Sequence, residues 1–268
     1  MDMRFDYHVH TTFSHDGRYP PEAFIARAKE LGLEELCFTE HIELDTCPPW
    51  EYTSADYSKW TPKMLALRAE TKGLSIKLGA ETTLWNEHTR AFTLDYIKGQ
   101  PLDFIIGSVH AVDGGIDPYL QPYFEGYTKQ QAYERYIRQI AESAKFADYC
   151  NVIGHLDYVA KQAPYPDRTF TYALCPDAFD TIFKTIIPRG IGLEINTSVF
   201  KTKDEAMWGL DIFTRYRELG GEFVTIGSDS HVPERLGWRR EDAIALARAA
   251  GIRYIATFER LKPKFHKI

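Results

Sequence analysis

Short apolar runs alternate with amphipathic stretches along the whole chain. The runs rich in β-branched and aromatic residues predict strands at residues 5–10, 36–40, 76–81, 104–109, 151–155, 192–196 and 223–227, with 254–258 as a possible last strand. Stretches with a helical period predict helices at residues 21–31, 57–72, 129–147, 177–187, 204–219 and 240–250. This alternation is typical of parallel strands joined by crossover helices, and it therefore predicts an α/β fold.

No internal repeat or low-complexity linker interrupts this rhythm, so we expect one domain that covers residues 1–268. The longest irregular stretches are 42–56, 110–128 and 157–175, and each of them follows a predicted strand. On a barrel, these three loops would meet at the C-terminal face, where such folds place their active sites. Long loops of this kind are usually functional.

Composition narrows the class of partner. A formal net charge of -6 argues against an extended nucleic acid as ligand, although a local cationic pocket could still bind one phosphate, so a small substrate is expected. The first residues lack the apolar stretch of a secretory signal, and later apolar runs are too short to cross a membrane, which predicts a cytoplasmic protein without membrane contact. The four cysteines, Cys37, Cys47, Cys150 and Cys175, lack Cys-x-x-Cys spacing and are expected to be reduced thiols. Composition gives no oligomeric state.

Histidines and carboxylates gather at the ends of the predicted strands. His8 and His10 point to the same side of the first strand, because side chains alternate, so both imidazoles can face one metal ion. A single His-x-His motif can arise by chance on a half-exposed strand. Five further strands, however, end in His41, Glu81, His110, His155, and Asp229 with His231. Together they predict a metal site whose donors suit zinc, manganese or iron.

The order of these motifs along the chain is more specific than any one of them. They are His8-Val9-His10-Thr11, Ser14-His15-Asp16-Gly17, Thr39-Glu40-His41, Glu81, Ser108-Val109-His110, Gly154-His155 and Ser228-Asp229-Ser230-His231. Over residues 8–231 the chain resembles the polymerase and histidinol phosphatase (PHP) superfamily of metal-dependent phosphoesterases. The resemblance implies a distorted (β/α)7 TIM-like barrel, with parallel strands and outer helices, that holds two or three divalent metal ions (Zn, Mn or Fe).

The resemblance also implies which residues hold each metal. The first metal would be bound by His8, His10, Glu81 and Asp229; the second by His110, His155 and the bridging Glu81; the third by Asp16, His41 and His231. Some family members have histidine where we match Asp16, so a shift of one residue would exchange it with His15; the Ser-x-Asp-Gly form favours Asp16. Glu40 replaces the usual aspartate of its motif, a change that removes no ligand. Catalytic roles are expected for Glu81, Asp229 and His231.

Within the superfamily, the length, the long loop after the fourth strand and the Gly-His-Leu-Asp sequence at 154–157 look closest to the histidinol-phosphate phosphatases of histidine biosynthesis. This likeness implies hydrolysis of L-histidinol phosphate to L-histidinol and phosphate. We expect a metal-bridging hydroxide to attack phosphorus in line. The metal motifs do not encode the leaving group, so another small phosphate ester, a nucleotide or a phosphodiester is the alternative.

Three residues are candidates for binding the substrate. Arg168 could bind phosphate in a bidentate manner, or it could be a solvated loop arginine. Asn196 ends the sixth strand and could touch the substrate. Glu43 could meet the amine of histidinol or donate the proton to the leaving alkoxide, for which His15 and a bound water are the other candidates. Acidic and aromatic residues that could also meet the amine and imidazole are Asp45, Trp50, Tyr52 and Trp85.

Two other classes of protein share part of this pattern. A deacetylase-like amidohydrolase on a (β/α)8 barrel also has a first-strand His-x-His, but its usual strand-four lysine bridge has no match, and Glu81 takes the bridging place. A regulatory domain that keeps the fold without activity would have lost metal ligands, and every expected ligand is present in the sequence.

Overall fold

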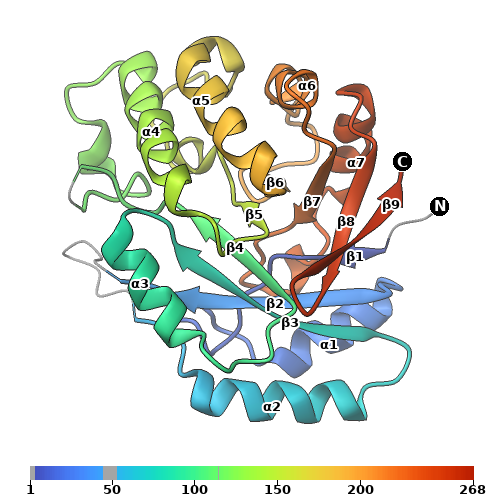
Figure 1. The fold of residues 1–268 in the computed structure, drawn as a ribbon. Coiled ribbons are helices and arrows are strands. Elements are labelled where there is room, and N and C mark those ends of the chain that lie inside the picture. The colour runs from blue at the N-terminus through green and yellow to red at the C-terminus, as the bar shows by residue number, and fades with distance from the viewer. Residues whose placement is uncertain (1–3, 45–52, 114) are drawn as a thin grey trace.

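Seven strand-and-helix units follow one another in the computed structural model, which describes residues 4–44, 53–113 and 115–268 (Figure 1). The strands of these units are β1 Phe5–Asp6, β2 Glu35–Ile42, β3 Ser75–Thr83, β4 Phe104–Ser108, β5 Val152–Ile153, β6 Gly192–Asn196 and β7 Phe223–Gly227. Their helices are α1 Pro21–Glu30, α2 Tyr57–Glu70, α3 Glu87–Tyr96, α4 Lys129–Ser143, α5 Pro176–Ile186, α6 Leu210–Glu218 and α7 Arg240–Ala249. A hairpin of β8 Tyr254–Glu259 and β9 Lys262–Lys267 ends the chain.

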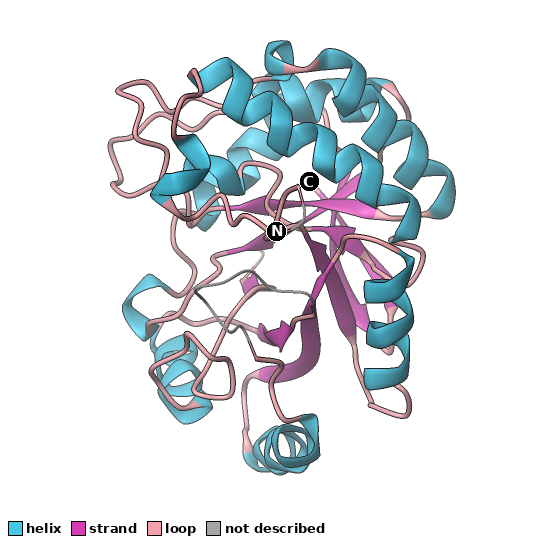
Figure 2. Ribbon diagram, turned by 90° about the vertical axis from the view of Figure 1, so that its left-hand side faces the viewer, coloured by secondary structure: helices cyan, strands magenta, loops and turns pink. Residues whose placement is uncertain are grey.

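The parallel strands close into a barrel. Strands β1 to β8 pair in sequence order and in parallel, and β9 pairs antiparallel with β8. The barrel closes between the segment after β1 and β7, where Tyr7 N–H donates to the Ile226 carbonyl at 3.1 Å and Val9 forms a parallel bridge with Ser230. Figure 2 shows the strands enclosed by helices on their outer side. The expected (β/α)7 TIM-like barrel is confirmed.

The core lies between the strands and the outer helices. Helix α5 buries a continuous apolar stripe of Phe179, Ile182, Phe183 and Ile186, as its helical period requires. Each such fully buried side chain stabilises the fold by roughly 1.5–3 kcal/mol relative to an exposed one. Because the helices shield the outer face of the barrel, the inward-facing strand positions and the strand ends are left to carry polar residues.

Two elements were missed because they lack an apolar pattern. Helix α3 buries only two threonines, Thr89 and Thr93, and its start is fixed by a capping box between Asn86 and Thr89 rather than by an apolar stripe. Strand β9 consists mostly of exposed residues, so alternation could not reveal it. Its pairing with β8 instead gives it order.

Several predicted boundaries also differ, among them those of β1, β5 and α6. Strands β1 and β5 have two residues each. The residues that follow them are not part of the regular strands, and these residues include His8, His10 and His155. Helix α6 begins at Leu210 instead of residue 204, because Gly209 precedes it with φ 92°, a left-handed conformation that glycine adopts without strain.

No helix within the described residues is both long and apolar enough to serve as a membrane span. The cysteines that the structure describes, Cys37, Cys150 and Cys175, are free and buried, while Cys47 lies outside the described residues. Burial raises the pKa of Cys150 to about 12 and that of Cys175 to about 11.

These thiols should be unreactive in the folded protein. A Cys47→Ser variant treated with a disulfide reagent at pH 8 is expected to stay unlabelled while folded, because only thiolates react and these thiols remain protonated and covered. Labelling should begin only as the pH rises toward 11, and unfolding in guanidinium should expose all three thiols at once. Labelling of the folded variant within minutes at pH 8 would contradict this arrangement.

Candidate metal centre

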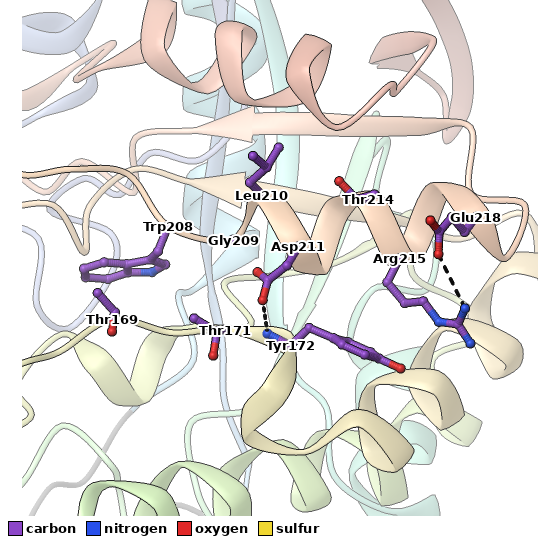
Figure 3. A pocket seen from close by; sticks show the side chains of 10 residues that line it. All are labelled: Thr169, Thr171, Tyr172, Trp208, Gly209, Leu210, Asp211, Thr214, Arg215 and Glu218. Atoms are coloured by element: carbon purple, nitrogen blue, oxygen red, sulfur yellow. Dashed lines mark hydrogen bonds and ion pairs between the residues drawn. The ribbon is translucent and has the colours of Figure 1, made fainter.

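A surface pocket of about 770 Å³ opens beside the start of α6, lined by Trp208, Leu210, Asp211, Arg215 and neighbours (Figure 3). At one end of it, Trp208 Nε1 donates to Asp157 at 2.8 Å. The predicted site residues do not line this pocket. They gather instead where the strands end at the C-terminal rim of the barrel.

The first group joins Glu81 of β3 with residues that directly follow β1 and β7. The Nε2 atoms of His8 and His10 lie 3.0 Å apart, and each lies 3.2 Å from Glu81 Oε2. Asp229 Oδ1 lies 3.7 Å from His8 Nε2 and 3.6 Å from His10 Nε2. All four side chains are buried.

The second group shares Glu81 with the first. Glu81 Oε1 lies 2.8 Å from His155 Nε2 and 3.3 Å from His110 Nε2, and these two nitrogens are 3.2 Å apart. One carboxylate therefore faces one group with Oε2 and the other group with Oε1. This is the arrangement that a bridging ligand between two metal ions requires.

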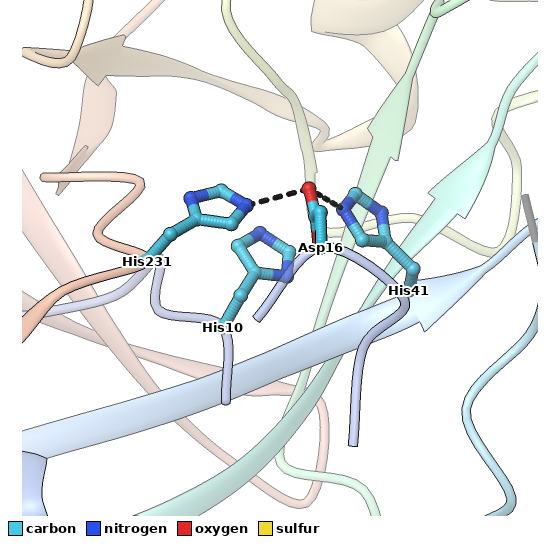
Figure 4. Close-up of side chains that lie close together, drawn as sticks. All are labelled: His10, Asp16, His41 and His231. Carbon is cyan, nitrogen blue, oxygen red and sulfur yellow. Dashed lines mark hydrogen bonds and ion pairs between the residues drawn. The ribbon is translucent and has the colours of Figure 1, made fainter. Parts of the chain in front are cut away.

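The third group, Asp16, His41 and His231 (Figure 4), is the most exposed one, because the side chains of Asp16 and His231 are 40% and 29% exposed. Asp16 Oδ2 lies 2.8 Å from His231 Nε2 and 3.5 Å from His41 Nε2, and the His10 ring stacks against each of those two rings. Within the described residues, Asp16 belongs to this group, whereas His15 belongs to none of the groups and places its ring 5.0 Å from that of His41. The geometry thus favours Asp16 as the ligand at this position.

The distances between these donors fit divalent cations. Zinc binds nitrogen and oxygen at about 2.0–2.2 Å, so tetrahedral ligands lie about 3.3–3.6 Å from one another. In the first two groups the distances range from 2.8 Å to 3.7 Å. Moreover, the Nε2 atoms of His8 and His10 face each other in a buried space, an arrangement that a shared cation would stabilise. The residues present therefore fit a metal cluster.

Electrostatics keep Glu81, Asp229 and His10 in the protonation states in which they can bind a metal. Burial alone would raise the pKa of Glu81, but His8 and His110 lower it well below the ordinary value. For Asp229, burial acts in the same way, and Lys161 and His8 lower the pKa well below the ordinary value. Burial, with His41 and His231, lowers the pKa of His10 to about 3. Both carboxylates are therefore ionised and His10 is neutral at physiological pH.

The local backbone explains how these side chains reach one point. Asp229 has φ 50°, a left-handed conformation that few residues other than glycine, asparagine and aspartate tolerate. A Cβ at Gly154, directly before His155, would lie 2.4 Å from Ser108 Oγ. Glycine at this position therefore lets the segment after β5 approach β4 beneath the metal centre.

Two charged residues at the site were missed by sequence reasoning. Lys161 follows the short helical turn Tyr158–Ala160, and its Nζ pairs with Asp229 Oδ2. Glu194 lies in the middle of β6, and its Oε1 is 2.6 Å from His8 Nδ1. The only sequence signal for Glu194 is an acidic residue within an otherwise apolar and buried strand. For Lys161 the sequence offers no comparable signal.

The three substrate-binding candidates lie in different surroundings. Both oxygens of Glu43 are engaged, since Oε1 lies 3.0 Å from His41 Nδ1 and 2.9 Å from His110 Nδ1, while Oε2 accepts from Thr83. Asn196 Nδ2 lies 3.4 Å from Asp229 Oδ2, at the edge of the first group. The Arg168 guanidinium donates to the Ala160 carbonyl at 2.9 Å and pairs with Glu205, which neutralises its charge. Their roles toward a substrate stay predictions, and Asp45, Trp50 and Tyr52 lie outside the described residues.

Comparison with known proteins covers almost the whole chain. The chain is 31% identical over 265 residues to the histidinol-phosphatase of Lactococcus lactis subsp. lactis (strain IL1403), with 97% of this chain and 96% of the relative covered. It is 30% identical over 259 residues to a probable histidinol-phosphatase of Clostridium acetobutylicum, with 97% and 98% covered.

Solved structures give the same picture. A crystal structure of histidinol phosphate phosphatase from Lactococcus lactis, in complex with zinc, L-histidinol and phosphate, superimposes with a TM-score of 0.90 at 30% identity and covers 98% of this chain and 99% of that one. A structure of a putative histidinol phosphatase from Listeria monocytogenes shares the fold, with a TM-score of 0.73 at 22% identity and 89% and 99% covered.

A protein-family model also matches this chain. The model of the PHP domain matches residues 6–198, a region that holds β2 to β6 and most of the residues of the three groups. With the motifs, the barrel and the near full-length relatives, this match shows that the chain belongs to the PHP domain family.

Proposed function

We propose that this protein is a metal-dependent phosphomonoesterase that hydrolyses L-histidinol phosphate to L-histidinol and phosphate, a step of histidine biosynthesis. The observation that carries the proposal is the Glu81 carboxylate shared by two groups of buried histidines, in a chain similar from end to end to a histidinol-phosphatase. In the Lactococcus relative, the structure contains zinc together with L-histidinol and phosphate.

We propose that the ligands are those that the family resemblance implies. His8, His10, Glu81 and Asp229 would hold the first ion, Glu81, His110 and His155 the second, and Asp16, His41 and His231 the third. When bound, divalent cations neutralise phosphate oxygens and lower the pKa of water, so that hydroxide is available near neutral pH. Zinc has support from the Lactococcus structure, and manganese and iron fit the same donor types.

The protein's own residues prepare the site for a phosphate ester. Glu81 and Asp229 concentrate negative charge inside the barrel, and the carboxylate of Glu43 holds the rings of His41 and His110 from behind. Lys161 places an ammonium group at the first group of ligands, because its Nζ contacts Asp229. Burial would lower the pKa of Lys161, but Asp229 raises it above the ordinary value, so the ammonium stays charged and can bind a phosphate oxygen.

Further substrate contacts remain part of this proposal. Asn196 lies beside Asp229 and could donate its amide to the substrate. Arg168 contacts the Ala160 carbonyl and Glu205, whereas Lys161 contacts Asp229 of the first group, so we assign Arg168 the smaller role. Glu43 is better placed to orient histidines than to bind the histidinol amine, because hydrogen bonds already occupy both of its oxygens.

Two broader features complete the proposal. We treat residues 1–268 as one domain, since β1 and β9, from the two ends of the chain, belong to the same sheet. A cytoplasmic location is supported by the free, buried thiols of Cys37, Cys150 and Cys175, which suit a reducing compartment.

A panel of substrates tests this function against its alternative. Purified protein loaded with zinc, manganese or iron would be given L-histidinol phosphate, an aryl phosphate monoester, a nucleoside monophosphate and an aryl phosphodiester, and phosphate or phenol release would be measured. We expect kcat/KM for L-histidinol phosphate to exceed the others by at least about tenfold, since its cationic groups suit an acidic site. A higher kcat/KM for the nucleotide or the diester would favour the alternative substrate class.

A further inference from the structure

Glu194 is a fully buried carboxylate that lies behind the metal centre. It stands on β6, where alternation directs Glu194 and Asn196 into the barrel and the apolar Leu193 and Ile195 toward the outer helices. The exposed fraction of Glu194 is 2%, and that of its neighbour His8 is 0%. An acidic side chain buried to this degree is costly unless its charge is compensated.

The contacts of Glu194 reach proposed ligands that follow three different strands. Its Oε1 lies 2.6 Å from His8 Nδ1, and its Oε2 accepts the backbone N–H of His155 at 2.9 Å. The same Oε2 accepts from Asn196 Nδ2 at 3.1 Å, and that amide group also lies 3.4 Å from Asp229 Oδ2. One carboxylate therefore contacts the ring of His8 after β1, the backbone of His155 after β5 and, through Asn196, the carboxylate of Asp229 after β7.

Gly227 leaves room for the Glu194 carboxylate beside His8. A Cβ at Gly227 would lie 2.2 Å from Glu194 Oε1 and 2.4 Å from His8 Cβ, so any larger residue at 227 would displace one of the two. Glycine at this position thus permits the contact between Glu194 and His8.

From these contacts we infer that Glu194 is a positioning residue of the metal centre, which fixes the ring and the tautomer of His8. A carboxylate can only accept hydrogen bonds, so His8 Nδ1 carries the proton. His8 Nε2 then presents its lone pair toward Glu81 Oε2, 3.2 Å away. A carboxylate that accepts the Nδ1 proton of a ligating histidine also makes the histidine Nε2 a stronger metal ligand. The inference rests on the proposed metal centre.

Glutamine at position 194 tests this role with little change in shape. If its amide nitrogen faced His8, it would donate to Nδ1 and force the His8 proton onto Nε2, where the metal binds. If its carbonyl faced His8, the amide nitrogen would oppose the His155 N–H and the Asn196 amide, which are both donors. Neither orientation satisfies all three contacts.

The experiment compares metal affinity in the unmodified protein, Glu194→Gln and Asp103→Asn. Asp103 is a matched control, because it is another buried carboxylate, which accepts from Leu78 N–H and pairs with Arg68 away from the metal centre. Metal release would be followed by competition with a chromophoric zinc chelator, and bound zinc would be counted by native mass spectrometry. We expect Glu194→Gln to bind one zinc ion, the one held by His8, about 10–100-fold less tightly than the unmodified protein does. Asp103→Asn should retain its zinc affinity even if its melting temperature falls.

A second measurement does not depend on the folding of the variant. In zinc-loaded, 15N-histidine-labelled unmodified protein, the His8 ring should show a proton bonded to Nδ1 and none on Nε2. Unchanged zinc affinity in a folded Glu194→Gln variant, or a His8 ring without a proton on Nδ1, would overturn the inference. If the unmodified protein bound no divalent metal, the proposed function would fail instead.

Discussion

A Glu81→Gln variant is expected to lose at least about 10³-fold in kcat for L-histidinol phosphate. Glu81 offers one oxygen to the His8 and His10 group and the other to the His110 and His155 group. Glutamine has nearly the same shape, but its amide nitrogen cannot bind a cation and its negative charge is lost. Loss of the several kcal/mol that metal ions contribute to a transition state corresponds to about a thousandfold in rate.

The measurement pairs kinetics with metal content. Initial rates of phosphate release would be compared with zinc content per chain for Glu81→Gln and for Glu35→Gln, a control on β2, the strand next to β3. Glu35 accepts from the Tyr7 hydroxyl near the opposite end of β2 from His41. The control should keep its zinc and its kcat within about twofold. A Glu81→Gln enzyme with a full metal complement and an unchanged kcat would contradict the bridging role.

A Lys161→Met variant is expected to lower kcat/KM for L-histidinol phosphate by about 10²-fold while the protein keeps its metals. The side chain of Lys161 is 15% exposed and pairs with Asp229, so its ammonium lies at the metal centre. Removing one preorganised electrostatic donor from an active site costs about 10²–10³-fold in rate. Methionine keeps roughly the length and the apolar stem of lysine and removes only the ammonium, which lies 5.2 Å from the centre of the Tyr158 ring.

Two further variants show whether charge at this position is the cause. Lys161→Arg keeps the charge and should recover at least a tenth of the unmodified kcat/KM. Lys129→Met removes a lysine of α4 that pairs with Asp167 on the surface, and it should leave kcat/KM within about twofold. Loss of bound zinc in Lys161→Met would show that Lys161 supports the ligand Asp229 rather than the substrate.

Much of the site could be predicted from the sequence, because most of the expected ligands lie at the ends of predicted strands. His8 and His10 share one side of a strand, and His110 and His155 follow glycine-containing strand ends, so period and position alone brought them together. Asp16 lies in a loop, and it was placed by family resemblance rather than by periodicity. The structure puts it beside His41 and His231, as that match implied.

The remaining parts of the site depend on the closed barrel. Glu194 contacts His8, and Lys161 contacts Asp229, although the two residues of each pair are far apart in the sequence. The contact between Glu194 and His8 forms because the segment after β1 pairs with the segment after β7 and so closes the barrel. For Arg168, the sequence suggested a role toward phosphate but did not show the residue's ion-pair partner. Its charge made it a candidate for phosphate, but the neighbouring Glu205, 37 positions later, could not be assigned to it from the sequence.

Metal dependence tests the central claim most directly. The purified protein would be stripped with a chelator, assayed for phosphate release from L-histidinol phosphate, and assayed again after stoichiometric addition of zinc, manganese or iron. We predict that activity falls to background when the metals are removed and returns with two to three equivalents of a divalent ion per chain. Full turnover by protein shown to contain no metal would contradict the account.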